Sequence, residues 1–420
     1  MSVDYLERGR TCMYRIIIRE GKEKQLEKHH PWVFTGAIEE VSPVFRMADW
    51  AEVYTHSGSF IAKGWYDEKS HIVLHLLTWD REEECDDDFV SSLVKKSIMR
   101  RKSFFSLEDT NCFRLIHGEA DFIPGLAADC YGREIRIILS SRFALNFLPV
   151  IISTLEDVMH PSRIQVTADQ FYASSEGLSE NTRYFIGGKE TKESEIPKDN
   201  TLFMESGIWY EISPGRGQKS GFYCDQRENR KISEKYTSGK TVLDVCPFTG
   251  AFTLHALRSG ALSVDAVDSS ESALRHLLYQ IHLNENKGVL PQGSRDRVTT
   301  TTADCFNYMR TVEENKYDVI ILDPPKLAQT KSKLENAIKA YKDLNRVAMT
   351  KIKSDGIIIT FSCSGALTRE NFLLLLSWAA SDAGCEIQVL ETLSAGSDHP
   401  ARISFPESQY LKGFVLRVIK

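Results

Sequence analysis

The pattern of apolar and polar positions changes twice along the chain and divides it into three parts. In the first part, up to residue 78, short β-rich runs alternate with turn residues. These runs are Tyr14–Ile18, Ala51–Thr55, Phe60–Trp65 and Ile72–Leu77. Short runs bounded by turn residues are typical of strands. The pattern therefore predicts a small, largely β domain over residues 1–78.

The second part, residues 79–190, mixes helical and extended patterns. The expected elements are a helix near Phe89–Phe105, a strand at Glu134–Leu139, a helix around Phe147–Met159 and a strand at Ser162–Val166. Such a mixture predicts a small central α/β domain. The stretch from Gly187 to Asn200 is polar and poor in apolar residues, so we expect it to be a linker.

In the third part, residues 191–420, strands and helices alternate strictly from about residue 240. The expected strands are 241–246, 263–268, 297–303, 317–322 and 356–361, and helices are expected up to Ser259, over 271–284 and near 333–353. This alternation predicts an α/β fold with a doubly wound parallel sheet. The alternation alone indicates a nucleotide-like ligand and no particular reaction.

Composition narrows the class of protein. The chain has 420 residues, 42% of them apolar and 26% charged, which is typical of a soluble protein of two or three domains. No apolar run approaches the roughly 18 residues that span a bilayer, and the first ten residues lack a signal-peptide core. We therefore expect a cytoplasmic protein without a membrane partner. The nine cysteines include no C-x-x-C pair, so no metal site is expected.

The net charge of −6 argues weakly against a nucleic-acid partner, because such proteins usually carry a basic surface. The total conceals two basic patches. The segment from Arg8 to His30 contains seven lysines and arginines and three acids, and the segment from Lys326 to Lys353 contains eight and two. A solvated helix face or loop is the simpler interpretation of each patch, and contact with RNA phosphates is the alternative.

Three acids, Asp244, Asp268 and Asp304, stand at the ends of successive predicted strands. The first strand leads into a turn with one glycine, Gly250, where a dinucleotide fold would have G-x-G-x-x-G. Asp268 is placed to accept hydrogen bonds from a ribose. Three acids suit a ligand with a ribose, an adenine amine and a cation, such as S-adenosylmethionine, and suit phosphates poorly. The alternative is that all three are helix N-caps.

Two short segments bring an acid and a thiol together. Ile320–Lys326 contains Asp323-Pro324-Pro325-Lys326, and Ile359–Gly365 contains Cys363. Each segment ends an apolar run that reads as a buried parallel strand, so both side chains would emerge at the carboxyl edge of one sheet, where such sheets bind ligands. Without this pairing, Cys363 would be interpreted as a small buried residue.

With these residues in view, the sequence resembles the bacterial family of large-subunit ribosomal RNA cytosine-C5 methyltransferases. These are class I enzymes that depend on S-adenosylmethionine. The similar segments are 30–36, 114–125, 220–227, 248–250, 323–326, 341–343, 361–364 and 410–414. They extend from about Tyr14 to the C-terminal end. The resemblance implies an N-terminal PUA-type RNA-binding domain, a central α/β domain and a class I methyltransferase domain.

The resemblance also implies a covalent mechanism. Cytosine carbon 5 is a poor nucleophile until a thiolate, here that of Cys363, adds to carbon 6. Asp323 would neutralise charge at ring nitrogen 3, and Pro324, Pro325 and Lys326 would form the loop around the extruded base. Candidates for the base that removes the carbon-5 proton are Glu407 and, beside His399, Asp398. The expected cofactor-binding residues are Asp225, Arg227, Asp244, Cys246, Phe248, Thr249, Gly250, Asp268, Ser269, Asp304, Cys305 and Asp323.

Two alternatives stay open. One keeps the fold and the cofactor but methylates another atom, such as a guanine nitrogen, with Cys363 structural, since Asp-Pro-Pro also occurs in amino-directed nucleic-acid methyltransferases. The other is an RNA-binding ribosome assembly factor with little turnover. The chain departs from close relatives at Asp244 and Ala251, where Asn and Gly are expected. The oligomeric state is open, with a homodimer among the options.

Overall fold

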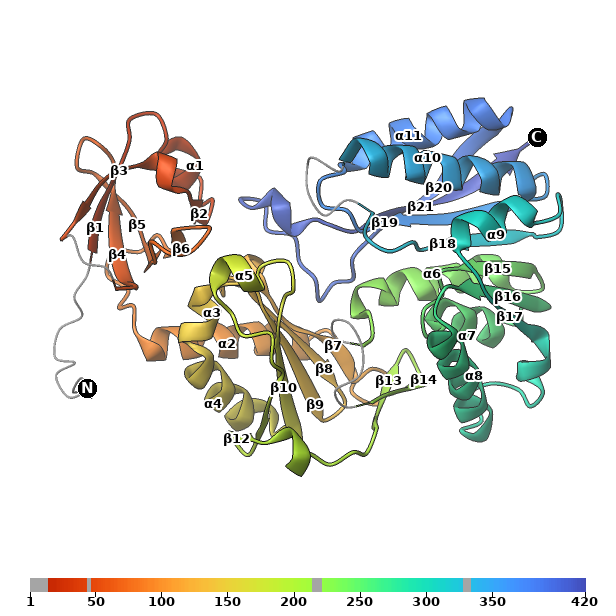
Figure 1. Cartoon of the computed structure of the whole chain (residues 1–420), viewed down its shortest axis with the longest axis horizontal. Coiled ribbons are helices and arrows are strands. Elements are labelled where there is room, and N and C mark those ends of the chain that lie inside the picture. Colours follow the sequence, from red (N-terminus) through yellow and green to blue (C-terminus); the bar gives the residue numbers. More distant parts are fainter. Residues whose placement is uncertain (1–13, 44–46, 214–220, 328–333) are drawn as a thin grey trace.

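The computed structural model describes residues 14–43, 47–213, 221–327 and 334–420. The chain forms three consecutive parts, which Figure 1 shows in red, in orange to yellow, and in green to blue. The N-terminal part is a six-stranded sheet in the order β2-β6-β5-β4-β1-β3. Its elements are β1 (Tyr14–Ile18), α1 (Lys24–Glu27), β2 (Trp32–Val33), β3 (Ile38–Ser42), β4 (Asp49–Tyr54), β5 (Phe60–Tyr66) and β6 (Leu74–Thr78).

The four strands predicted for this part are confirmed, and two strands were missed. β2 has two residues, which is too short to show a period. β3 has the sequence IEEVS and no buried residue, because it pairs on one side only, at the edge of the sheet. An edge strand that buries no side chain lacks the apolar alternation by which strands are recognised.

His75 in β6 is a polar residue within this core. Its side chain is 3% exposed, and neither ring nitrogen has a hydrogen-bond partner among the residues that the structure describes. Burial lowers the pKa of His75 to about 3, although the nearby Asp67 carboxylate opposes the change. The imidazole is therefore neutral at physiological pH.

This buried histidine predicts a pH dependence of stability. The unfolded chain takes up the proton near pH 6.5 and the folded chain only near pH 3, so His75 favours unfolding increasingly as the pH falls below 6.5. Between pH 7 and 5 it should lower the free energy of unfolding by about 2 kcal/mol. Urea unfolding followed by tryptophan fluorescence should show that loss in the wild type and a correspondingly smaller loss in His75→Leu. Equal losses in both proteins would contradict this account.

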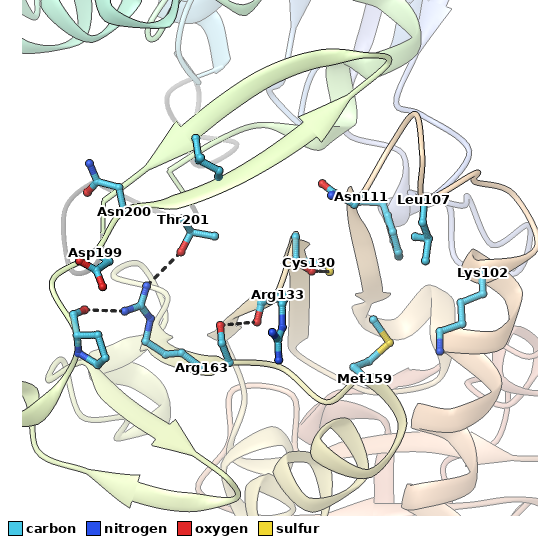
Figure 2. A pocket seen from close by; sticks show the side chains of 15 residues that line it. Lys102, Leu107, Asn111, Cys130, Arg133, Met159, Arg163, Asp199, Asn200 and Thr201 are labelled. Atoms are coloured by element: carbon cyan, nitrogen blue, oxygen red, sulfur yellow. Dashed lines mark hydrogen bonds between the residues drawn. The ribbon is translucent and has the colours of Figure 1, made fainter. Parts of the chain in front are cut away.

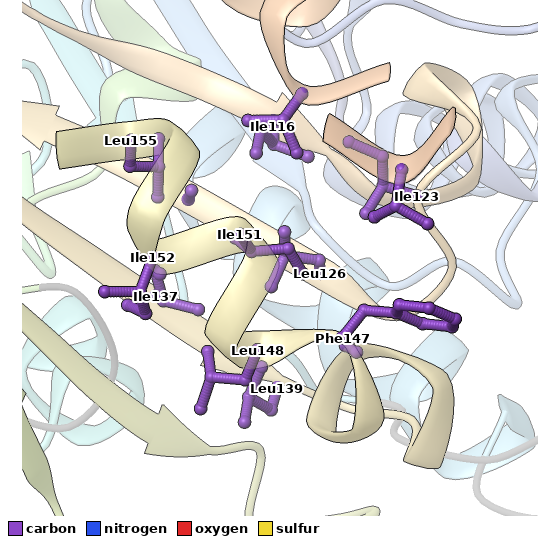
Figure 3. Packing of buried hydrophobic residues seen from close by; sticks show 14 of the residues in the cluster. Ile116, Ile123, Leu126, Ile137, Leu139, Phe147, Leu148, Ile151, Ile152 and Leu155 are labelled. Atoms are coloured by element: carbon purple, nitrogen blue, oxygen red, sulfur yellow. The ribbon is translucent and has the colours of Figure 1, made fainter. Parts of the chain in front are cut away.

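The central part is a six-stranded sheet in the order β12-β11-β10-β9-β8-β7. Its strands are β7 (Cys112–His117), β8 (Leu126–Tyr131), β9 (Glu134–Leu139), β10 (Arg163–Ala168), β11 (Arg183–Ile186) and β12 (Lys189–Thr191), and its helices are α2 (Asp87–Lys102), α3 (Arg142–Asn146), α4 (Leu148–Met159) and α5 (Ala173–Glu176). Figure 3 shows the apolar face of α4, with Ile151, Ile152 and Leu155, packed against Ile137 of the sheet. The helical pattern of the sequence encodes this face.

The predicted linker is partly wrong. Gly187 and Gly188 both have positive φ and form the turn between β11 and β12, whose residues pair from Ile186 with Lys189 onward. Two glycines in this conformation are typical of a tight hairpin turn. The polar composition of the segment reflects an exposed hairpin at the edge of the sheet, and only the residues after Thr191 connect it to the next hairpin.

That next hairpin, β13 (Thr201–Glu205) and β14 (Ile208–Ile212), joins the central and third parts. Phe203 and Tyr210 are completely buried and belong to the same apolar cluster as Tyr131 of the central sheet and Leu277 of the third part. The two parts therefore share a continuous core rather than a flexible connection.

The third part is a seven-stranded sheet in the order β17-β16-β15-β18-β19-β21-β20. The strands are β15 (Thr241–Val245), β16 (Ser263–Asp268), β17 (Val298–Thr302), β18 (Val319–Leu322), β19 (Ile357–Ser362), β20 (Glu386–Ser394) and β21 (Lys412–Ile419). The helices are α6 (Arg227–Thr237), α7 (Ala251–Arg258), α8 (Glu271–Asn286), α9 (Cys305–Thr311), α10 (Leu334–Lys351) and α11 (Arg369–Ala383). α6, α7 and α8 cover one face of the sheet and α9, α10 and α11 the other (Figure 1).

The predicted doubly wound sheet is confirmed, with one correction. The first five strands are parallel to one another, but β21 runs antiparallel between β19 and β20. In this order β18 is the central strand, so the ends of β15, β18 and β19 lie side by side. Among the described residues, no helix has the length and apolar character needed to cross a membrane.

Candidate functional site

Asp323 and Cys363 lie at the same edge of the sheet. Strand β18 ends at Leu322, which pairs with Thr360 of β19, and β19 ends at Ser362. Asp323 therefore follows one strand and Cys363 follows its neighbour. Both side chains are half-buried, and the Gln226 amide donates a hydrogen bond of 3.0 Å to Asp323 Oδ1. The structure thus brings together the acid and the thiol that the sequence pairs.

Asp323 is suited to hold a proton near neutral pH. Burial, with the negative charges of Asp225 and Asp244, raises the pKa of Asp323 to about 7, against the smaller opposing effects of Arg230 and Gln226. A carboxyl group with this pKa is protonated in a substantial fraction of molecules and can donate a hydrogen bond. Pro324 beside it is buried, whereas Lys326 is exposed.

Tyr223 completes this surface and was not singled out from the sequence. Burial raises the pKa of Tyr223 to about 12, and the charges of Asp225, Cys363 and Asp323 act in the same direction. Its side chain is still 41% exposed, and its ring lies 5.7 Å from that of Phe248. Tyr223 thus offers a neutral aromatic face beside the acid and the thiol. Its place in the segment 220–227 was the only sequence signal for it.

Asp244 at the end of β15 is completely buried. Thr253 donates a hydrogen bond of 2.7 Å to Oδ2, while Oδ1 has no partner among the described residues. Burial raises the pKa of Asp244 to about 7. A buried carboxylate oxygen without a donor is costly, and a ligand that donates to it would remove this cost.

The turn after β15 has an unusual backbone. Cys246 and Phe248 have φ values of +63° and +53°, a left-handed conformation that is rare for residues with side chains and is often found at ligand sites. Gly250 has φ of +84°, and a Cβ there would lie 2.3 Å from the Leu277 side chain. The one glycine of the turn is therefore required by both conformation and space. The Cys246 thiol donates to the Cys305 sulfur at 2.9 Å.

Asp268 and Asp304 end the next two strands, as predicted. The two oxygens of Asp268 accept from the backbone amides of Phe248 and Ser270 at 3.0 and 2.9 Å, so this carboxylate fixes the turn after β15. Asp304 is the N-cap of α9 and accepts from Asn307 N at 2.9 Å. Asp304 is therefore a helix N-cap, which was the alternative to cofactor binding. Its side chain is exposed, and it can still accept further hydrogen bonds. Thr249 is half-buried and Ser269 exposed.

Asp225 provides a second unpartnered oxygen. Its side chain is 8% exposed, and Oδ2 accepts from the Tyr410 hydroxyl at 2.6 Å. Oδ1 is buried and has no partner among the residues described. Together, Asp225 Oδ1 and Asp244 Oδ1 are acceptors that fit a cationic donor, such as the ammonium group of an amino acid.

Arg227 is placed differently from its expected role. Its guanidinium donates to both oxygens of Asp398, at 3.1 and 2.8 Å, and lies 4.3 Å above the Phe105 ring of the central part. Although burial acts in the opposite direction, the contact with His399 and then that with Arg227 hold the pKa of Asp398 far below its usual value. Asp398 is therefore a firmly ionised structural partner and a poor proton acceptor, and we no longer assign it as a base.

The observed contacts of Glu407 are with the N-terminal part and not with Asp323 or Cys363. Its side chain is 49% exposed, and it lies 3.6 Å from His30 of the N-terminal part. The Phe405 ring, two residues earlier, packs 4.6 Å from Trp32. The segment around Glu407 thus joins the third part to the N-terminal sheet.

The basic segment after Pro325 is largely neutralised where it is described. Lys342 pairs with Asp382 at 2.7 Å and Arg346 with Asp343 at 2.8 Å. Residues 331–333 lie outside the described ranges. Contact of α10 with a phosphate backbone would have to compete with these surface ion pairs, which are individually weak.

The Arg227–Asp398 pair predicts a large effect on stability. Asp398→Asn leaves the buried guanidinium with only the 41% exposed Glu228 carboxylate, 3.1 Å away, as a charged partner, so the free energy of unfolding should fall by about 3 kcal/mol. The matched control is Glu391→Gln, which breaks the exposed 2.9 Å pair with Lys235 and should cost less than about 1 kcal/mol. Denaturant midpoints of both variants test the comparison. Similar small losses in the two would show that the buried pair is not a structural joint.

A cavity of about 640 Å³ lies away from these residues, between the hairpin β13–β14 and the central sheet (Figure 2). Its lining includes Lys102, Arg133 and Arg163, and the Arg163 guanidinium donates to Thr201 at 3.3 Å and to the Pro197 carbonyl at 3.0 Å. None of the predicted site residues lines it.

Comparison with known proteins gives two family matches. Residues 16–79 match a PUA-like domain, and residues 154–400 match the family described as S-adenosylmethionine-dependent methyltransferase. A protein of Shewanella amazonensis named ribosomal RNA large subunit methyltransferase I is 34% identical over 409 residues, which cover 96% of this chain and 99% of the relative. A protein of the same name from Tolumonas auensis is 33% identical over 407 residues, again covering 96% and 99%.

Among solved structures, a candidate S-adenosylmethionine-dependent methyltransferase from Streptococcus mutans has a TM-score of 0.77. It is 20% identical and matches over 96% of this chain and all of the other. A similar chain with the same TM-score was solved in complex with SAH. At this level of identity the similarity shows the fold.

Proposed function

Because the chain belongs to the family of S-adenosylmethionine-dependent methyltransferases, we propose that it methylates carbon 5 of a cytosine in large-subunit ribosomal RNA through a covalent adduct with Cys363. The relatives' names support the RNA substrate. Carbon 5 is proposed as the target atom because Asp323 and Cys363 follow the ends of adjacent strands. The reaction at this atom needs a thiol beside an acid that holds a proton.

In the proposed reaction, the Cys363 thiolate adds to carbon 6 of the cytosine, and the electrons of the 5,6 double bond move toward carbon 5. Asp323 donates its proton to ring nitrogen 3 and so neutralises the charge that the addition creates. When bound, S-adenosylmethionine supplies the electrophilic methyl group. A base then removes the proton from carbon 5, the double bond re-forms, the thiolate leaves carbon 6, and Asp323 recovers its proton.

The base for this last step is not assigned to a side chain. Glu407 was the first candidate from the sequence, but its contact with His30 directs it to the N-terminal part. Tyr223 has a raised pKa and is better suited to stack against the extruded base than to accept a proton. Aromatic stacking of this kind holds single bases in many RNA-binding sites.

We propose that the carboxylates around the β15 turn hold the cofactor. Asp244 Oδ1 and Asp225 Oδ1 would accept from its ammonium group, because both are buried acceptors to which no described residue donates. Asp268 would accept from the ribose hydroxyls through its remaining lone pairs, and Asp304 from the adenine amine. The left-handed turn from Cys246 to Gly250 would then follow the cofactor backbone closely.

We also propose to divide the chain into domains at residues 78 and 190, giving an N-terminal PUA-type domain, a central α/β domain and the methyltransferase domain. The match of residues 16–79 to a PUA-like domain supports the first limit. The end of the central sheet at Thr191 supports the second.

Identification of the product tests the proposed function. The purified protein is incubated with labelled S-adenosylmethionine and unmodified large-subunit rRNA, and the RNA is digested to nucleosides. The expected labelled product has the mass and retention of 5-methylcytidine. A methylated guanosine would favour a different target atom, and binding of RNA without label would favour an assembly factor.

A further inference from the structure

Lys412 is a buried cation beside the candidate nucleophile. It is 4% exposed, begins strand β21, and pairs directly with Ser362, the residue before Cys363. Lysine is rarely buried to this extent unless it is paired. Among the described residues, the charges that act on its ammonium group include no carboxylate, so its burial requires another explanation.

The Lys412 ammonium group holds the turn that carries Cys363. It donates to the Ser364 carbonyl at 2.7 Å and also to the Leu367 carbonyl. These two carbonyls lie after β19 and before Thr368, which caps α11. The backbone on the C-terminal side of Cys363 is thereby fixed at two points.

Of the charged groups near Lys412 that the structure describes, only Cys363 favours the protonated, cationic form of the lysine. Arg369 of α11 and Lys326 of the loop after β18 both oppose its charge, and Cys363 favours it. Burial is the largest effect and lowers the pKa of Lys412 to about 8. The Tyr341 hydroxyl lies 3.2 Å from Ser364 Oγ, and its raised pKa keeps it uncharged at neutral pH. The Lys412 ammonium group is thus cationic over most of the physiological pH range.

We propose that Lys412 is a positioning residue for the nucleophile: its ammonium group fixes the Cys363 turn through two carbonyls and stabilises the thiolate that attacks the base. The inference rests on the proposed function, because it gives Cys363 the role of nucleophile. A positive charge near a cysteine favours its thiolate form, and this effect activates many reactive cysteines. The place of Lys412 in the segment 410–414 was the only sequence signal for it, since Lys412 lies 49 residues from Cys363 in the chain.

The test is the pH dependence of Cys363 alkylation by iodoacetamide, measured by mass spectrometry of the peptide that contains it. Neither RNA nor cofactor is needed, so the readout is independent of methyl transfer. Lys412→Gln keeps a donor for the carbonyls but removes the charge, and its alkylation midpoint should rise by about one pH unit or more. Lys412→Arg keeps the charge and should return the midpoint toward that of the wild type.

Cys385, which is partly exposed in the same domain, is the internal control and should react equally in all proteins. If Lys412→Gln does not fold, Lys412→Met provides the uncharged comparison. An unchanged midpoint in the folded uncharged variant would overturn the proposal. Full methyl transfer by Cys363→Ala would instead overturn the proposed function and leave an observed midpoint shift standing, so the two failures are distinguishable.

Discussion

Cys363→Ala is expected to abolish methyl transfer to RNA, with turnover lowered by about 10⁴-fold or more. The reason is chemical, because carbon 5 of cytosine cannot attack a methyl group at a useful rate until a nucleophile has added to carbon 6. The side chain is half-buried at the end of β19 and removal of its sulfur leaves a small space. The measurement is the rate of label transfer from S-adenosylmethionine to unmodified rRNA under single-turnover conditions.

The matched control is Cys385→Ala. Cys385 is also partly exposed and lies in the methyltransferase domain, but it donates to the Ala380 carbonyl. It directly precedes Glu386, which pairs with Ile419 at the opposite end of β21 from Lys412. Its substitution should leave the rate within about twofold of the wild type, as expected for a change away from the reacting atoms. If both variants kept the wild-type rate, Cys363 would be a packing residue.

Asp323→Ala should lower turnover by about 10²- to 10⁴-fold, the usual effect of removing a general acid. Without the carboxyl group, the charge that forms at ring nitrogen 3 loses its proposed proton donor. Cofactor binding provides the control, because the substitution should change the rate more than the affinity for S-adenosylhomocysteine measured by calorimetry. An equal loss in both would indicate that Asp323 acts mainly through the cofactor.

The role of Asp323 as a proton donor also predicts how turnover changes with pH. The pKa of Asp323 is raised to about 7, and the reaction needs its protonated form, so turnover should fall as the pH rises through about 7. Asp323→Asn keeps a hydrogen-bond donor that does not ionise. Its rate should be lower than that of the wild type but should lack this alkaline decrease. A decrease that persists in Asp323→Asn would assign the titration to another group.

Elements and residues with a local signal could be predicted from the sequence. The central strands of the third part, such as Val319–Leu322 and Ile357–Ser362, are short runs of mainly buried apolar residues, and such runs between helical patterns indicate a parallel sheet. Because strand ends in such a sheet meet at one edge, Asp323 and Cys363 could be paired before the structure was known. The acids at the ends of β15, β16 and β17 followed from the same geometry.

Features that depend on contacts distant in sequence could not be predicted. Asp398 lies 171 residues from Arg227, and nothing local distinguishes an ion-paired carboxylate from a free one, so Asp398 stood beside Glu407 as a candidate for the base. The insertion of β21 between β19 and β20 is decided by tertiary pairing. Gly187 and Gly188 indicated a turn correctly, but composition could not tell a hairpin turn from the start of a linker.

The most direct test of the central claim is to trap the covalent intermediate. RNA that contains 5-fluorocytidine at the target position would accept the Cys363 thiolate and the methyl group, but the fluorine at carbon 5 cannot leave as a proton does, so the adduct should persist. Mass spectrometry of the digested complex should then find the modified nucleotide attached to Cys363. Methyl transfer without any adduct, or an adduct on another cysteine, would contradict the account.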